Sequence, residues 1–219
     1  MTTNESLFFR DGRPFEHFSR SMLPCLLARR GAERRLRIWS AAAATGQEAY
    51  SLAICVEELN PCPRDWTIEI LGTDISEQAL ERARQGVYTQ FEAQRGLSTQ
   101  RLVKWFTQEP NGWRVKGQVA RHVRFARHNL LADGRTHGVF DVIFVRNVLI
   151  YFDLETKRRV IANLARAIAG DGFLVLGGTE TLLGVSDLFT AEPEERGIYR
   201  PSAFRRSPLG PPDDGAGRR

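Results

Sequence analysis

Leu36-Arg-Ile-Trp-Ser-Ala-Ala-Ala-Ala-Thr-Gly-Gln-Glu-Ala-Tyr-Ser-Leu-Ala-Ile-Cys-Val-Glu-Glu-Leu59 contains a short apolar strand, a turn of small residues and a helix, in that order. The strand covers residues 36–40, and apolar residues recur at helical spacing between residues 46 and 59. Prolines at positions 61 and 63 end the helix, because proline cannot continue one. Residues 67–73 form a second apolar strand, so this part of the chain predicts a β-α-β unit.

Strands and helices continue to alternate along the rest of the chain. This order predicts an α/β fold with a mostly parallel sheet and helices on both faces. Ligands of such sheets bind at the carboxyl ends of the strands, where the strand order reverses. The further elements we expect are helices over residues 76–86, 98–106 and 154–169, a small antiparallel hairpin over residues 113–125, strands over residues 140–145 and 173–176, and a closing hairpin from residues 188–189 and 197–200.

The turn after the first strand lacks the features of a phosphate-binding loop. A dinucleotide fingerprint needs three glycines, and only Gly46 is present, without the lysine of a P-loop. The alanines at positions 41–44 allow close approach of a ligand, although they are less open than glycines at positive φ. This composition argues against ATP, GTP and NAD and favours a nucleoside without phosphates. A tightly packed turn that binds no ligand explains these residues equally well.

Asp74 shifts that balance toward a nucleoside site. It stands at the carboxyl end of the second strand, where a carboxylate can accept hydrogen bonds from both ribose hydroxyls. It could instead cap the following helix, but Ser76 is a competing N-cap residue. A small-residue turn and an acidic residue at the two expected strand ends together predict nucleoside binding.

Length and composition limit the class of protein. The 219 residues suffice for one α/β domain with a core that needs no disulfides or metals. Three cysteines without metal-ligand or redox spacing indicate a reducing compartment, and we expect a cytoplasmic protein. The N-terminus has no signal-like apolar region, and no stretch is long and apolar enough for a membrane span, so we expect no membrane insertion. No metal site is predicted.

The net charge of +5 is concentrated at the two ends of the chain and in one internal segment. Residues 114–128 hold five basic and no acidic side chains, which would suit an acidic protein partner or a phosphate backbone, or would simply form a solvated face. Nucleic acid is an improbable substrate because no aromatic stacking motif accompanies the charge. The four histidines, at positions 17, 122, 128 and 137, fit surface or hairpin positions better than catalytic ones.

Six motifs follow one another along the chain. They are Leu7-Phe-Phe-Arg-Asp11, Ile38-Trp-Ser-Ala-Ala42, Thr45-Gly46 with Glu48 and Tyr50-Ser-Leu-Ala53, Gly72-Thr-Asp-Ile75, Asn129-Leu-Leu131, and Arg146-Asn-Val-Leu-Ile-Tyr-Phe-Asp153. In this order they resemble the motifs of the receptor glutamate methyltransferases of bacterial chemotaxis, of the CheR type, over residues 4 to about 200. The eight-residue motif that begins at Arg146 is long and unusual, which makes the resemblance specific.

The resemblance implies a fold, a cofactor and a set of site residues. The fold is a Rossmann-like class I S-adenosylmethionine-dependent methyltransferase over residues 1–200, with a small antiparallel β-subdomain at about residues 112–128 and a disordered tail at 201–219. The cofactor is S-adenosylmethionine and the product S-adenosylhomocysteine. Asp74 would bind the ribose, and Asn147 and Val148 would lie near the reacting end. The other implied cofactor-binding residues are Asn4, Ser6, Arg10, Glu48, Asn129 and Leu130.

Methyl transfer to glutamate needs few catalytic groups. A glutamate carboxylate, with a pKa of about 4.3, is already ionised at neutral pH, so no general base is required. The enzyme supplies alignment and excludes water. We expect Arg10 to orient the carboxylate or the cofactor through its guanidinium fork. Tyr151 is the second candidate catalytic residue, and a place in the core is the alternative for its side chain.

The chain departs from the family in ways that affect its partners. Family members carry a basic helical domain before the Phe-Phe-Arg motif, and only seven residues precede Phe8 here. We therefore expect that a separate recognition subunit binds the substrate, or that the substrate differs. The expected partner is an acidic helical region of a chemoreceptor or a similar signalling protein, which the basic hairpin over residues 113–125 could steer. A regulatory module that binds the cofactor without turnover, and a methyltransferase for small carboxylic acids, are the alternatives.

Overall fold

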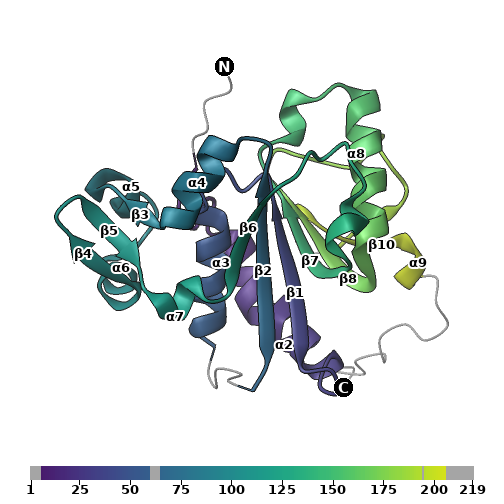
Figure 1. The fold of residues 1–219 in the computed structure, drawn as a ribbon. Coiled ribbons are helices and arrows are strands. Elements are labelled where there is room, and N and C mark those ends of the chain that lie inside the picture. The colour runs from purple at the N-terminus through teal and green to yellow at the C-terminus, as the bar shows by residue number, and fades with distance from the viewer. Residues whose placement is uncertain (1–5, 60–64, 194, 206–219) are drawn as a thin grey trace.

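The computed structural model describes residues 6–59, 65–193 and 195–205. Within them, seven strands form one sheet in the order β6-β2-β1-β7-β8-β10-β9 (Figure 1). The first five strands of this order are parallel, and β10 runs antiparallel to β8 and β9. Their bounds are β1 Arg35–Ala41, β2 Thr67–Asp74, β6 Val123–Arg127, β7 Phe140–Val145, β8 Ile168–Leu176, β9 Phe189–Ala191 and β10 Ile198–Pro201. The strand order reverses between β1 and β7, so a ligand site is expected where these two strands end.

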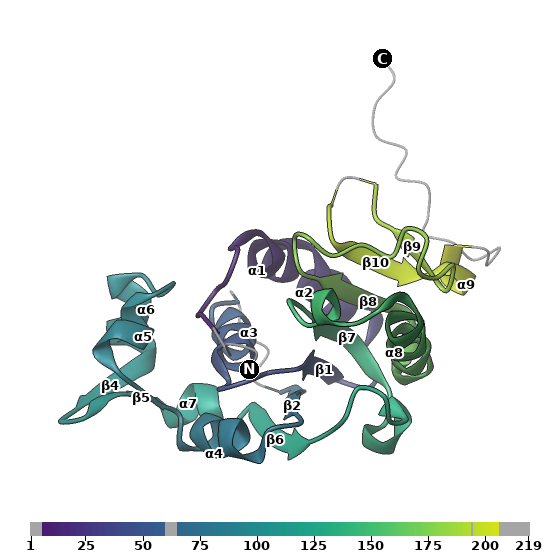
Figure 2. The ribbon, with the colours of Figure 1, turned by 90° about the horizontal axis from the view of Figure 1, so that it is seen from above.

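Helices cover both faces of this sheet, as the alternation of elements predicts. Figure 2 shows α1, α2 and α3 on one side of the strands and α8 on the other. Helix α4 begins after β2, and the Ser76 hydroxyl accepts a hydrogen bond from the backbone N–H of Ala79, as an N-cap does. The helices are α1 Arg13–His17, a π-helical turn η1 Phe18–Met22, α2 Leu23–Arg29, α3 Gln47–Glu57, α4 Glu77–Gln85 and α8 Leu154–Ala167.

Each face of the sheet has its own apolar core. On the side of α3, Ile38, Phe144 and Phe18 are fully buried together. On the side of α8, Trp39, Ile143 and other side chains are equally buried. Because neighbouring strand residues point to opposite faces, the near-continuous apolar runs of the central strands fill both cores.

A second, three-stranded antiparallel sheet has the order β3-β5-β4. It stands apart from the main sheet together with two short helices (Figure 2). Its hairpin turn contains Asn111-Gly112, a strong hairpin signal, and Gly112 has φ 146° with the carbonyl of Tyr88 packed against its Cα. The elements are β3 Val87–Tyr88, α5 Gln90–Gln94, α6 Thr99–Trp105, β4 Phe106–Glu109 and β5 Gly112–Val115.

The hairpin predicted over residues 113–125 is wrong in its pairing. Strand β5 pairs with β4, whereas β6 pairs in parallel with β2 at the edge of the main sheet. The short helix α7, Gly117–Ala120, separates β5 from β6. Phe125 in β6 packs edge-to-face on Tyr50 of α3, and this contact favours the main sheet over a local hairpin. The expected small antiparallel sheet therefore exists, but residues 87–115 form it and residues 123–127 do not.

The closing hairpin predicted for residues 188–189 and 197–200 is confirmed by the pairing of β9 with β10. Pro201 is the last residue of β10, and α9, Ser202–Arg205, follows it. Secondary structure thus continues for five residues into the predicted tail, and residues 206–219 lie outside the described residues. The short helices η2, Gly134–His137, and η3, Leu149–Tyr151, complete the elements. In the described ranges, no helix is long and apolar enough to cross a membrane.

Four arginine and histidine side chains of the basic segment have acidic partners elsewhere in the chain or close by. Arg121 and His122 both contact the buried carboxylate of Glu57. Arg124 pairs with Glu69, and Arg114 pairs with Glu109. The segment is therefore less positive than its sequence indicates, because folding brings acids to it from α3 and β2.

His128 occupies a buried position, contrary to the surface or hairpin position that we predicted. Its ring packs on Trp39 and lies 3.2 Å from His137, from Nδ1 to Nε2. Burial lowers the pKa of His128, and the neighbouring His137 lowers it further. Burial and Arg37 likewise lower the pKa of His137.

These two lowered pKa values predict that the folded state is less stable in mild acid than at neutral pH. Between the folded values and the unfolded value of about 6.5, the unfolded chain binds more protons. Stability is therefore fully present above about pH 6.5 and falls as the pH drops through the folded values. We expect a lower Tm at pH 5.5 than at pH 7.5, and a smaller difference in the His128→Gln/His137→Gln double variant, measured by thermal unfolding. An equal difference in both proteins would contradict this prediction.

Candidate active site

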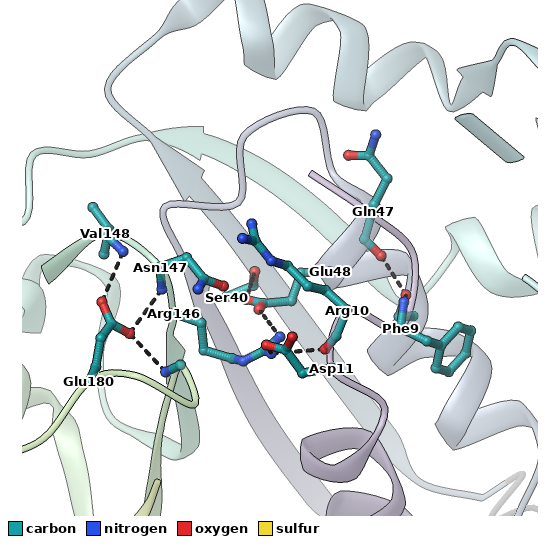
Figure 3. Close-up of polar contacts among 12 residues, drawn as sticks. Phe9, Arg10, Asp11, Ser40, Gln47, Glu48, Arg146, Asn147, Val148 and Glu180 are labelled. Atoms are coloured by element: carbon teal, nitrogen blue, oxygen red, sulfur yellow. Dashed lines mark hydrogen bonds and ion pairs between the residues drawn. The ribbon is translucent and has the colours of Figure 1, made fainter. Parts of the chain in front are cut away.

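Arg146 joins three segments at the carboxyl ends of β1 and β7. Its side chain is 2% exposed. The guanidinium donates to the Glu48 carboxylate at 3.1 Å, to the Asp11 carboxylate at 2.7 Å and to the Arg10 carbonyl at 2.8 Å. The other oxygen of Glu48 accepts from the Ser40 hydroxyl at 2.8 Å (Figure 3). Arg146 thus ties the N-terminal segment to the first turn of α3 at the place where strand order reverses.

The N-terminal segment is held against α3 and the small sheet by its two phenylalanines. The Phe9 backbone N–H donates to the Ser51 hydroxyl of α3 at 3.0 Å. Phe8 is fully buried, with its ring edge-to-face on Tyr88 and Phe106. Close packing of Gly96 on the Phe8 carbonyl leaves no space for a Cβ there. The Phe-Phe-Arg motif therefore places Arg10 by burying the residues before it.

The alanine-rich turn adopts a conformation that its sequence did not indicate. Ala42 and Ala44 have φ values of 68° and 48°, in the left-handed region that we expected only of glycines. Each such residue costs roughly 1 kcal/mol, so tertiary contacts must hold the turn. The Ala43 N–H donates to the Thr73 carbonyl, and the Ala44 N–H donates to the Asp74 carboxylate at 2.9 Å.

Asp74 holds this turn by hydrogen bonds and still has acceptor positions for a ligand. One carboxylate oxygen accepts from Ala44 and the other from the Ser76 N–H at 2.9 Å. An ionised carboxylate offers about four acceptor positions, so two remain for hydroxyl donors. Since Ser76 caps α4, Asp74 does not have that role. A half-buried carboxylate beside a turn of small residues suits a nucleoside ribose and disfavours phosphate.

A second strained turn follows Arg146 at the end of β7. Asn147 has φ 56°, and the Glu180 carboxylate accepts hydrogen bonds from the backbone N–H groups of Asn147 and Val148. Tyr151, at the end of η3, is 57% exposed. The core position considered for this tyrosine is therefore wrong, and its phenol is accessible at the edge of the sheet.

The structure places the remaining predicted site residues in different settings. The Asn129 side chain accepts from the Leu131 N–H at 3.0 Å, as in an Asx turn, while Leu130 is buried beneath α8. Ser6 is half-buried at the start of the described N-terminal segment, and Asn4 lies outside the described residues. Asn129 follows β6, so these residues border the same edge of the sheet as Asp74.

Comparison with known proteins identifies the family. The family described as CheR methyltransferase, SAM binding domain, matches residues 4–198. The chain belongs to the CheR methyltransferase family. It is an S-adenosylmethionine-dependent methyltransferase with the Rossmann-like fold of class I, and S-adenosylmethionine is its cofactor.

Chemotaxis proteins are among the relatives of this CheR family chain. It is 40% identical over 191 residues to chemotaxis protein methyltransferase 1 of Pseudomonas aeruginosa, an alignment that covers 85% of this chain and 69% of the relative. It is 41% identical to the chemotaxis protein methyltransferase of Vibrio parahaemolyticus, over 86% of this chain and 69% of the relative. A TehB-like S-adenosylmethionine-dependent methyltransferase of Corynebacterium glutamicum is a structural neighbour with a TM-score of 0.47 and 16% identity, over 80% of this chain and 85% of the neighbour.

Two residues that build this CheR site were not among the predicted site residues. Arg146 opens the most specific motif, and its place after a buried strand was the signal that could have identified it. Glu180 belongs to none of the quoted motifs. It meets Asn147 only because β7 and β8 are neighbours in the sheet, so local sequence carries no sign of its role.

Proposed function

We propose that this chain transfers the methyl group of S-adenosylmethionine to glutamate side-chain carboxylates of a chemoreceptor-like signalling protein. The products would be glutamate methyl esters and S-adenosylhomocysteine. The Arg146 network supports this proposal most directly, because it joins Glu48 to the backbone of Arg10 beside the Asn147 turn, where the strand order of the sheet reverses. The names of the relatives, chemotaxis protein methyltransferases, support the same class of substrate.

The proposed reaction requires alignment rather than acid-base catalysis. When bound, S-adenosylmethionine would supply an electrophilic methyl group on a sulfonium. A substrate carboxylate oxygen would form the new C–O bond as the methyl C–S bond breaks, and the electron pair of the broken bond would stay on sulfur. Because the carboxylate is ionised at neutral pH, no proton has to move. Rate enhancement then depends on holding nucleophile and methyl group in line and away from water.

Specific side chains are proposed for the two ligands. Asp74 would accept from the ribose hydroxyls, and Glu48 would bind another polar group of the cofactor. Arg10, whose backbone Arg146 holds, would orient the incoming carboxylate, and the exposed Tyr151 would contact the same substrate. The further cofactor contacts that we propose are those of Asn4, Ser6, Arg10, Asn129, Leu130, Asn147 and Val148.

Tritium transfer tests the proposed substrate. The chain, S-adenosylmethionine tritiated on its methyl group and the cytoplasmic fragment of a chemoreceptor are incubated together, and base-labile methanol is collected. We expect volatile label that depends on the receptor and disappears when its acceptor glutamates are replaced by glutamine. A separate recognition subunit, if needed, would appear as label released only after a cell extract is added.

Two results would contradict the proposed substrate. Cofactor binding without methyl transfer to the receptor, with or without extract, would favour a regulatory module. Label released from small carboxylic acids but not from the receptor would favour a small-molecule methyltransferase. In addition, Arg10→Ala and Tyr151→Phe variants that both turn over normally at saturating cofactor would show that these two residues have other roles.

A further inference from the structure

The carboxylate of Glu180 binds four backbone N–H groups in two turns. Oε2 accepts from Asn147 at 2.9 Å and from Gly177 at 2.8 Å. Oε1 accepts from Val148 at 3.1 Å and from Leu149 at 2.8 Å. Glu180 is itself buried, with 7% of its surface exposed. One side chain after β8 therefore holds the whole turn that follows β7.

This arrangement maintains a backbone conformation that Asn147 would not adopt without support. Its φ of 56° lies in the left-handed region, which asparagine tolerates better than most residues but still at a cost. The three N–H groups of residues 147–149 precede and begin the short helix η3, where no carbonyl of a preceding turn can pair with them. Glu180 satisfies all three groups and so holds the backbone from which the Asn147 side chain extends. That side chain points away from Glu180 (Figure 3).

Gly177 leaves the space that this carboxylate occupies. A Cβ on Gly177 would lie 2.7 Å from Glu180 Oε2 and 3.1 Å from both the backbone nitrogen and the side-chain Nδ2 of Asn147. Such contacts would push the carboxylate off the turn. A Cβ on the next residue, Gly178, would meet no atom within 4 Å. The two adjacent glycines thus provide a perturbing substitution and a matched control.

We propose that Glu180 is a positioning residue for methyl transfer that acts through Asn147. Its carboxylate holds the turn so that the Asn147 amide faces the reacting end of the bound cofactor. The inference rests on the proposed function only in placing Asn147 beside the cofactor. Misplacement of a reacting group by about 1 Å can cost roughly 100-fold in rate, so a fixed turn has a direct catalytic value.

A double-mutant cycle tests whether Glu180 acts through Asn147. The single variants are Glu180→Gln, Gly177→Ala and Asn147→Ala. The two double variants combine Asn147→Ala with Glu180→Gln or with Gly177→Ala, and Gly178→Ala is the control. Alanine is tolerable at position 147 because Ala42 and Ala44 have similar φ values in this protein. Calorimetry measures the affinity for S-adenosylhomocysteine, and methyl-transfer assays measure kcat and KM. All measurements are made at a temperature well below the Tm of each variant.

We expect Glu180→Gln and Gly177→Ala each to weaken S-adenosylhomocysteine binding or lower kcat by about tenfold or more. Both should have little further effect when Asn147 is already alanine, because coupled residues are not additive. Gly178→Ala should match the wild type. A glutamine has one acceptor oxygen and turns its NH₂ group toward two N–H groups, so it cannot replace the carboxylate.

Additivity would overturn the inference. If Glu180→Gln or Gly177→Ala reduces affinity and kcat by the same factor with Asn147 present or absent, Glu180 has a structural role only. If Glu180→Gln does not fold, Glu180→Asp, whose carboxylate is one methylene shorter, replaces it in the cycle. Coupling of Gly177→Ala alone does not decide, because its Cβ also meets the Asn147 side chain directly. Binding of S-adenosylhomocysteine needs no methyl acceptor, so the cycle remains informative if the receptor proves not to be the substrate.

Discussion

Replacement of Arg146 by methionine is expected to lower the free energy of unfolding by about 3 kcal/mol and to remove measurable cofactor binding. The side chain is almost fully buried and donates to Glu48, Asp11 and the Arg10 carbonyl. Methionine has a comparable length but leaves the half-buried Glu48 carboxylate without its cation. It also releases the segment that carries Arg10, so stability and ligand binding should fall together.

Urea unfolding and calorimetry with S-adenosylhomocysteine measure the two effects. Arg135→Met is the control, because Arg135 is 60% exposed and pairs only with the neighbouring Asp133 within the described residues. Surface pairs of this kind contribute little, so we expect Arg135→Met to unfold at the same urea concentration as the wild type. An Arg146→Met protein that binds the cofactor with wild-type affinity would show that this network does not build the site.

The Asp74→Asn variant should bind S-adenosylhomocysteine about 100-fold more weakly, a loss of about 2.7 kcal/mol. An amide has only one acceptor oxygen, and its NH₂ group cannot accept from the N–H of Ala44 or Ser76. The substitution therefore removes charge-assisted bonds to a ribose and loosens the alanine-rich turn at once.

Glu77→Gln provides a control for charge at the same end of α4. Glu77 follows Ser76 by one residue, is 48% exposed and pairs with Arg84. Its replacement should leave affinity within twofold of the wild type, as calorimetry at equal ionic strength can show. Equal losses of affinity in Asp74→Asn and Glu77→Gln would mean that the negative charge of this region attracts the cofactor, and that contact between Asp74 and the ribose does not.

Parts of the site were predictable because short segments contain their determinants. A strand, an alanine turn and a helix in sequence place Glu48, and the following strand places Asp74 at its carboxyl end. The left-handed φ values of Ala42 and Ala44 were not predictable from residue type. They depend on Thr73 and Asp74, which reach the turn only when β1 and β2 pair.

The order of the elements, the two-sided sheet and the family follow from the sequence alone, because hydrophobic periodicity and contiguous motifs are local properties. Only the tertiary structure decided the partner of β6, the burial of His128 and the exposure of Tyr151. It also decided the contacts of Arg146 and Glu180, which join residues more than 30 positions apart. Such contacts form when strands distant in the chain become neighbours, and buried polar groups must then find partners in space rather than in sequence.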